Sequence, residues 1–239
     1  MCAGSGKLTL REALWELLEG PVDFMKAVTL QLVPPIASQR PATAPSEETE
    51  LVGAITRGDP GWQKRAFEAF HGLVHGLVLK SLGPNAEVSD LVGDVFLMFF
   101  ESAHRIREAS AVRSYLVSIT MNRVRREVRR QKHRKLLYFF TGRPPPEVAH
   151  RAGPDDPKAK AALIHLSRIL DELNADERAT FVLHSLEGME VAEIAIVLGV
   201  SLSTAKRRVR RASEHVRKRV SRNALLSDYI REKTVRRHD

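Results

Sequence analysis

The chain has 239 residues, of which 43% are hydrophobic, and this is enough for one large or two small soluble domains. Its 38 Lys and Arg residues outnumber its 29 Asp and Glu residues, and the net charge of +9 favours a polyanionic partner, with nucleic acid ahead of an anionic membrane surface. Cys2 is the only cysteine, which excludes an intrachain disulfide and a thiolate metal cluster, and no apolar run approaches the roughly 20 residues of a membrane span, so we expect a cytoplasmic protein.

Residues 1–46 are expected to form an N-terminal extension and linker. Within them, residues 8–18 have helical periodicity, and residues 34–46 are rich in Pro and Ala, a composition typical of linkers. Helical periodicity resumes at Glu47, and the Gly58-Asp59-Pro60-Gly61 turn separates the next two helices.

A first helical domain is predicted over residues 47–140. Its third helix has a wide apolar stripe at offsets of three and four, formed by Val88, Leu91, Val92, Val95, Phe96 and Phe99. Its last helix, over residues 112–135, is apolar on more than one side at its start and charged at its end. Residues 123–135 contain eight basic residues and one acid. We therefore expect the start of this helix to be buried and its end to bind a polyanion.

A second domain is predicted over residues 161–222, after a flexible linker at residues 141–160 and before a basic tail at residues 223–239. Five prolines lie between residues 143 and 157, without sustained periodicity. Beyond them, helical stretches cover residues 163–173, 176–186, 191–198 and 203–222. No strand pattern is found along the chain. The predicted fold class is therefore all-α, with an N-terminal helical bundle and a C-terminal helix-turn-helix domain joined by the linker.

Residues 190–212 have the pattern of a helix-turn-helix. Gly199 can adopt the positive φ of a sharp helix end, and Ser201 or Ser203 can cap the helix that follows. The inward stripe of that helix is formed by Ala205, Val209, Ala212 and Val216. Its basic residues face outward and can meet phosphates and base edges in a major groove. A solvated basic face is the simpler alternative, but the turn and the capping residues favour DNA binding.

The second domain also resembles a known family. Residues 170–174, 191–195, 198–201 and 204–206, with Glu177, Arg178 and Phe181 between them, closely resemble the promoter −35 domain of extracytoplasmic-function sigma factors. Asn174 stands where a proline is usual in that family. The resemblance implies that the −35 element is bound by Ser203, Thr204, Lys206, Arg207, Arg208, Arg210 and Arg211.

The first domain resembles the other half of the same family. Residues 89–97 resemble the helix that docks on the polymerase clamp, although Gly93 replaces the usual glutamine. This match implies that polymerase is bound by Asp90, Leu91, Asp94 and Phe96, of which Leu91 and Phe96 also serve the core of the domain. Residues 114–116 with Ile119 and the residues that follow resemble the helix that reads and opens the −10 element. This second match implies that the non-template strand is bound by Asn122, Arg123, Arg126, Arg129 and Arg130, with phosphate contact alone as the simpler role.

Together the two resemblances cover residues 47–222 and imply a sigma factor that reads the −35 and −10 elements. Its implied partners are core RNA polymerase and promoter DNA, and an anti-sigma factor is a further partner that the resemblance allows. We expect no cofactor and no catalytic site, because neither a nucleophile nor a phosphate-binding glycine loop accompanies the acids. His71 and His75 are four residues apart, but no acid or cysteine completes a metal site, so no metal is expected either.

Two other classes of protein remain open at this point. A helix-turn-helix regulator that binds DNA without polymerase would usually dimerise on a palindrome, whereas a sigma factor should be monomeric and need core polymerase. An adaptor or anti-sigma-like protein that binds only other proteins would tolerate neutralisation of its basic segments.

Overall fold

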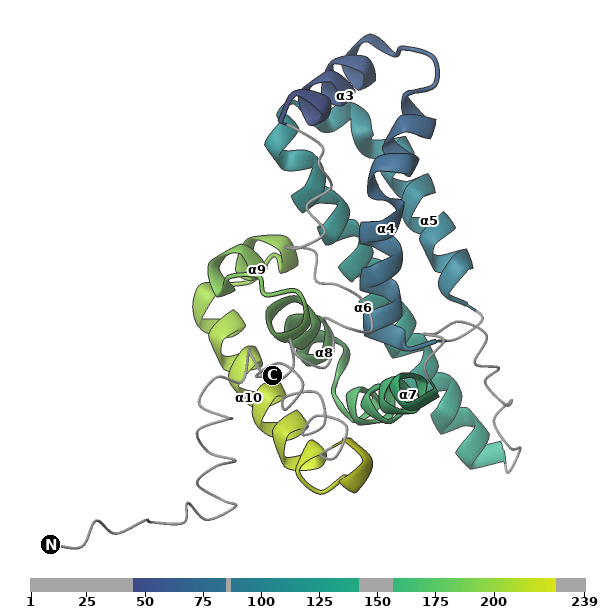
Figure 1. The fold of residues 1–239 in the computed structure, drawn as a ribbon, viewed down its shortest axis with the longest axis vertical. Helices are drawn as coiled ribbons and strands as arrows, with labels where there is room; N and C mark the ends of the chain where they lie inside the picture. Colours follow the sequence, from purple (N-terminus) through teal and green to yellow (C-terminus); the bar gives the residue numbers. More distant parts are fainter. Residues whose placement is uncertain (1–44, 85–86, 142–156, 227–239) are drawn as a thin grey trace, which may run out of the picture.

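The computed structural model describes residues 45–84, 87–141 and 157–226, and all regular structure in these ranges is helical (Figure 1). The expected all-α fold class is thereby confirmed. The helical piece expected at residues 8–18, most of the Pro- and Ala-rich segment, most of the basic tail and the centre of the predicted linker lie outside the described residues, whereas Pro45 and Ser46 already belong to a helix. None of the described helices is both long and apolar enough to cross a membrane.

The N-terminal domain consists of α3 (Pro45–Arg57), α4 (Trp62–Leu82), α5 (Val88–Ser102), the short 3₁₀ helix η1 (Ala103–Arg105) and α6 (Ala109–Thr141). The predicted turn before α4 is present, with Gly58 and Gly61 at φ angles of 70° and 83°, where a side chain would be strained. The core contains fully buried aromatic and aliphatic side chains such as Phe70, Leu77 and Phe99. Each such side chain contributes about 1.5–3 kcal/mol of burial free energy.

The C-terminal domain consists of α7 (Pro157–Glu172), α8 (Ala175–Phe181), the π-helical turn η2 (Val182–Leu186), α9 (Val191–Leu198) and α10 (Leu202–Val220). Helix α7 begins inside the stretch that the sequence assigns to the linker. A core specific to this domain joins α7 and α8 to α10 through residues such as Leu166, Phe181 and Val216.

Side chains at the helix ends explain where the C-terminal helices begin. Asn174 caps α8, because its side-chain oxygen accepts the backbone N–H groups of Asp176 and Glu177 at 3.1 and 2.8 Å. Gly199 ends α9 at φ 63°, as its position in the sequence predicts, and Ser201 caps α10 by accepting the Thr204 N–H at 3.2 Å. Asn174 thus fixes the start of α8 at the position where the family has a proline.

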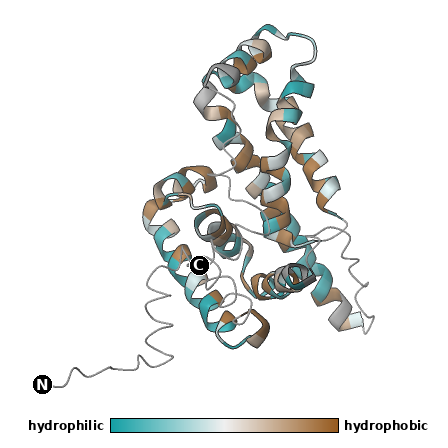
Figure 2. Ribbon diagram, viewed as in Figure 1, coloured by the Kyte–Doolittle hydropathy of each residue, from teal (hydrophilic) through white to brown (hydrophobic). Residues whose placement is uncertain are grey.

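The two domains pack directly against each other. Apolar side chains of α8, η2 and α9 join the core of the N-terminal domain in one continuous cluster, to which the C-terminal domain contributes Ala175, Ala179, Leu183, Ile194, Val197 and Leu198. Figure 1 shows α8 and α9 beside α6, and Figure 2 shows hydrophobic stretches on these helices. The described structure is therefore a closed arrangement in which the two halves of the chain share apolar surface.

Candidate nucleic-acid interface

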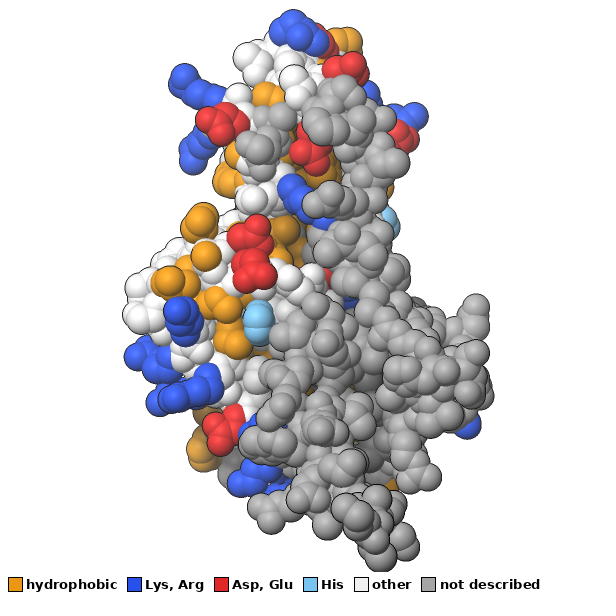
Figure 3. All heavy atoms as spheres, turned by 60° about the vertical axis from the view of Figure 1, so that its left-hand side comes forward, with side chains coloured by type: hydrophobic (Ala, Val, Ile, Leu, Met, Phe, Trp, Pro, Cys, Tyr) orange, Lys and Arg blue, Asp and Glu red, His pale blue; other side chains and the backbone are white. Residues whose placement is uncertain are grey.

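Helix α10 is amphipathic and presents a row of cations to solvent. Ala205, Ala212 and Val216 are buried, and Val209 is half-buried, so the predicted inward stripe is confirmed. Lys206, Arg207, Arg210 and Arg211 are exposed, and none of them has an ion pair within the described part of the chain. Figure 3 shows Lys and Arg side chains gathered along the edge of the face that carries α9 and α10. One side of the helix therefore packs in its own domain, and the other side is exposed and can bind a polyanion.

The other predicted −35 residues have partners in this structure. The Ser201 hydroxyl lies 3.0 Å from that of Ser203 and donates to the Thr204 hydroxyl at 2.9 Å, so both side chains belong to the cap of α10. Arg208 is only 22% exposed, and its Nη2 lies 3.4 Å from Oδ2 of Asp176. Arg208 therefore differs from the cations beside it on the helix, because it is held by an acid of its own protein.

The predicted −10 residues all lie on α6, where they divide into free and engaged side chains. Arg126 is exposed and has no ion pair within the described residues. Asn122 is also exposed and accepts a hydrogen bond from Arg125. Arg129 reaches Oδ1 of Asp176 at 3.4 Å, whereas Arg123 and Arg130 pair with acids of the N-terminal domain. Arg126 is thus the cation of this set that is most available for DNA.

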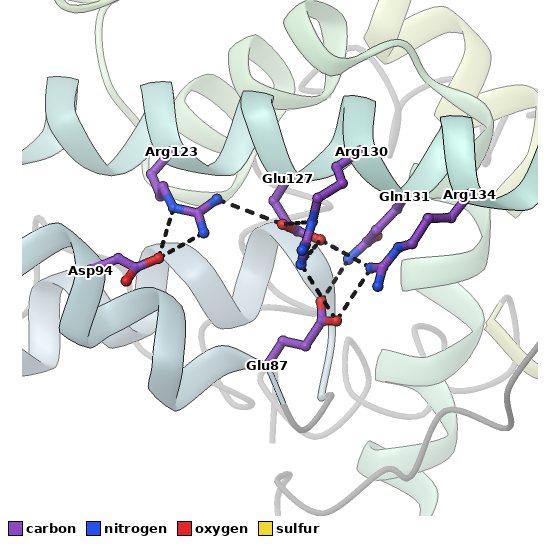
Figure 4. Close-up of polar contacts among 7 residues, drawn as sticks. All are labelled: Glu87, Asp94, Arg123, Glu127, Arg130, Gln131 and Arg134. Carbon is purple, nitrogen blue, oxygen red and sulfur yellow. Dashed lines mark hydrogen bonds and ion pairs between the residues drawn. The ribbon is translucent and has the colours of Figure 1, made fainter.

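Glu127 organises the arginines on the α5 side of α6 (Figure 4). Its carboxylate is fully buried and accepts Arg130 Nε at 2.8 Å and Arg134 Nη2 at 3.3 Å, and Arg123 Nη1 lies 3.6 Å away. Glu87, the residue before α5, meets Arg134 at 3.2 Å from the opposite side. The hydrogen bond to Glu127 raises the pKa of the Arg130 guanidinium above its usual value. Arg123 and Arg130 therefore form ion pairs within the N-terminal domain in this structure.

The predicted polymerase-binding residues on α5 are similarly divided. Asp90 is exposed and has no ion pair within the described residues. Asp94 is half-exposed and accepts Arg123 Nη2 at 2.7 Å. Leu91 and Phe96 are buried, at 3% and 2% exposure, so they pack in the core of the domain rather than offering a surface. Leu97, which follows the two acids on the same helix face, is 62% exposed and provides apolar surface beside them.

A basic groove of about 420 Å³ separates α6 from the C-terminal domain. Arg129, Lys132 and His133 line it from α6, and Arg207, Arg208 and Arg211 line it from α10. Asp176, at the start of α8, contacts both sides, because its carboxylate reaches Arg125 at 3.1 Å as well as Arg129 and Arg208. We call these four residues the Asp176 cluster. The structure thus brings one predicted −10 residue, Arg129, to the same groove as three predicted −35 residues, Arg207, Arg208 and Arg211.

A buried ion pair joins the domains at a second point. Lys80 of α4 donates to Glu187 Oε1 at 2.8 Å, and the two side chains are 2% and 0% exposed. Glu187 directly follows the π-helical turn, and its backbone N–H bonds to the Val182 carbonyl at 3.0 Å. Burial lowers the pKa of Lys80 below its usual value, and the Glu187 carboxylate opposes that shift.

Sequence reasoning missed Asp176, Lys80 and Glu187 as structural residues. No local pattern indicates that they meet, since Lys80 and Glu187 are 107 residues apart in the chain. Glu127 was open to prediction, because a single acid within eight basic residues is placed to pair with several of them. Across residues 45–84, 87–141 and 157–226 no three His, Cys, Asp or Glu side chains form a metal site, and His71 and His75 stack at 5.7 Å between ring centroids.

Two family models match the chain, one for each described domain. Sigma-70 region 2 matches residues 66–134, and Sigma-70, region 4 matches residues 164–216. The ferric citrate uptake sigma factor FecI of Escherichia coli is 31% identical over 155 residues, which cover 62% of this chain and 87% of FecI. The RNA polymerase sigma factor CnrH of Cupriavidus metallidurans is 28% identical over 151 residues, which cover 60% of this chain and 79% of CnrH.

Two solved structures share the fold. CnrH in complex with the cytosolic domain of CnrY aligns with a TM-score of 0.54 at 22% identity, over 74% of this chain and 99% of CnrH. RpoE in complex with the anti-sigma factor NepR, from Bartonella quintana, aligns with a TM-score of 0.50 at 20% identity, over 66% of this chain and 96% of RpoE. At these identities the alignments concern the fold of the two helical domains.

Proposed function

Because the chain belongs to the sigma-70 family and is a promoter-recognising RNA polymerase sigma factor, we propose that α10 reads the −35 element and α6 reads the −10 element. The observation that carries the first assignment is the row of exposed cations at Lys206, Arg207, Arg210 and Arg211, opposite a buried apolar stripe. Such a helix can enter a major groove while its other side stays packed on its domain. Ser203, Thr204 and Arg208 complete the proposed −35 set.

The proposed −10 surface is centred on Asn122 and Arg126, the two exposed members of the predicted −10 set that no acid within the described residues holds. Arg129 joins them when it leaves Asp176. Arg123 and Arg130 act through Glu127, which fixes their guanidinium groups along one side of the helix. This arrangement favours contact between the outer arginines and the DNA backbone. It also favours separation of the two DNA strands beside these arginines.

We assign polymerase docking to the exposed side of α5, with Asp90 as its free acid and Leu97 as its apolar component. Charge reversal by Asp90→Lys should weaken capture of core polymerase in a pull-down assay. Glu101→Lys, at the far end of the same helix, is the matched control and should bind core polymerase normally. Equal capture of wild type and Asp90→Lys, with both folded by circular dichroism, would remove this face of α5 from the docking surface.

The whole assignment is tested by run-off transcription with core polymerase and duplex templates that carry −35 and −10 elements. RNA of defined length is expected only when the protein is present, and the protein should be monomeric in solution. A stand-alone regulator would instead bind duplex DNA as a dimer and would give no transcript with core polymerase. An adaptor that binds only proteins would give neither result.

We also propose where the protein acts, what it binds and how its chain is divided into domains. The protein acts in the cytoplasm, where core polymerase is found, and it is not an enzyme. An anti-sigma factor is a further proposed partner, since CnrH and RpoE are both found in complexes with other proteins, in the second case an anti-sigma factor. Residues 47–140 and 161–222 are the two functional domains, with residues 141–160 as their connection.

A further inference from the structure

The exposed cations of α10 suit guanine better than the other bases. They are Lys206, Arg207, Arg210 and Arg211, and their charged groups are hydrogen-bond donors without an acceptor. In the major groove such donors pair with the O6 and N7 acceptors of guanine. Residues 202–212 contain neither Asn nor Gln, which suit adenine, nor Asp or Glu, which accept from cytosine. The cations alone therefore leave A·T base pairs of the −35 element without a characteristic contact.

Leu202, the first residue of α10, is apolar and exposed. It is 46% exposed and belongs to neither hydrophobic cluster of the described chain, whereas Ala205 in the same turn is almost completely buried. Residues four apart are neighbours on a helix surface, so Leu202 lies beside Lys206, and Arg210 continues the same row. The row therefore has an apolar side chain at its N-terminal end and cations along the rest.

The cap of α10 fixes the backbone at Leu202 and engages the hydroxyl groups beside it. Ser201, the residue before Leu202, accepts the Thr204 N–H at 3.2 Å. The Ser201 hydroxyl lies 3.0 Å from that of Ser203 and donates to that of Thr204 at 2.9 Å. In a helix-turn-helix, the N-terminal residues of the second helix contact base edges. Leu202 thus lies where bases are read, while the hydroxyl groups beside it bond to one another.

We propose that Leu202 selects a thymine in the −35 element by packing against the C5-methyl group of that base. This methyl group distinguishes thymine in the major groove, and apolar side chains are the ones that contact it. Cytosine at the same place has hydrogen instead of the methyl group, and its amino group would lose water beside leucine without gaining a partner. The inference rests on the proposed assignment of α10 to the −35 element, and it adds a thymine to the bases that the cations select.

The first experiment is selection of duplexes by the holoenzyme that contains the full chain. The duplexes keep the −10 element of a template that gives a run-off transcript, and their −35 region is randomised. Wild type should enrich thymine at one position, and Leu202→Ala should lose that enrichment while the other positions keep theirs. Leu225→Ala is the matched control and should select as wild type does, because Leu225 is also exposed, at 41%, but follows the other end of α10.

The second experiment removes only the methyl group, by replacing the selected thymine with deoxyuridine. The affinity of the wild-type holoenzyme, measured by fluorescence anisotropy, should fall about fourfold, as expected for the loss of one buried methyl group. The Leu202→Ala holoenzyme should bind the thymine and deoxyuridine duplexes almost equally. Non-additivity of the two changes shows that the leucine and the methyl group are in contact.

The inference is overturned if no thymine is enriched by wild type, if Leu202→Ala selects the same thymine, or if deoxyuridine weakens binding of both proteins equally. Enrichment of guanines that depends on Lys206 or Arg210 but not on Leu202 would keep the proposed function and overturn this inference alone. Failure of the proposed function has a different signature. Wild type then gives no run-off transcript and enriches no sequence in the −35 region, and the role of Leu202 falls with it.

Discussion

Replacement of Arg207 and Arg210 by alanine should lower the salt dependence of promoter binding by the holoenzyme. Both side chains are exposed on α10, and neither forms an ion pair within the described residues. The buried stripe at Ala205 and Ala212 is untouched, and alanine retains the helix propensity of these positions. The double variant should therefore fold as wild type does and lose only contacts to DNA.

The size of the effect follows from counterion release. Each phosphate contact contributes about 0.9 to the slope of log affinity against log salt, so two contacts contribute about 1.8. When salt rises fourfold, from about 50 to about 200 mM, these two contacts account for about a 12-fold loss of affinity. Over this range of salt, the affinity of wild type for the promoter should therefore fall about 12-fold more than the affinity of the double variant.

The measurement is fluorescence anisotropy of a labelled −35 duplex titrated with holoenzyme at several salt concentrations. Lys218→Ala, an exposed cation in the last turn of α10, is the matched control and should leave the slope within experimental error of wild type. Parallel salt curves for wild type and the Arg207 and Arg210 variant would show that these arginines do not contact phosphates, and the proposed reading face of α10 would be refuted.

Other outcomes are expected from the same structure. Alanine at Asn122 and Arg126 should impair opening of duplex promoters and weaken binding of the holoenzyme to a single-stranded −10 oligonucleotide, while normal opening by this variant would move the −10 surface elsewhere. Gly93→Gln should stabilise the protein by up to about 1 kcal/mol, seen as a higher Tm, because a Cβ there meets no atom within 4 Å and glycine weakens a helix. Burial alone would raise the pKa of Asp171, but Arg178 and Lys135 together outweigh it and hold that pKa below its usual value. This carboxylate therefore adds stability above the ordinary carboxyl pKa of about 3.9 and loses it as pH falls through the lower folded value. Asp171→Asn should accordingly lower Tm at pH 7, the Tm difference from wild type should narrow as pH falls below about 4, and a difference that does not narrow with falling pH would contradict this reasoning.

Local sequence patterns were sufficient for the class of fold and for several helix boundaries. The spacing of apolar residues predicted α9 over residues 191–198, which are its observed bounds. Gly199 was identified as the end of that helix, and of the two caps predicted for the next helix, Ser201 and Ser203, the structure uses Ser201. These features depend on residues within one or two helical turns, so a single sequence contains the information. The resemblance to the family identified the two halves of the chain, and the family models match the same two regions.

The sequence by itself therefore determined an all-α chain with a helix-turn-helix and two basic helices. Only the tertiary structure decided which of the basic side chains are free. Arg126 and Arg130 are both exposed arginines of α6, yet Arg126 has no ion pair within the described residues and Arg130 bonds to the buried Glu127, because helix rotation and packing bring α5 to only one side of α6. Asp176 and the Lys80–Glu187 pair depend on contacts between segments far apart in the chain, which no local periodicity encodes, because such contacts form only when apolar faces of the two domains come together.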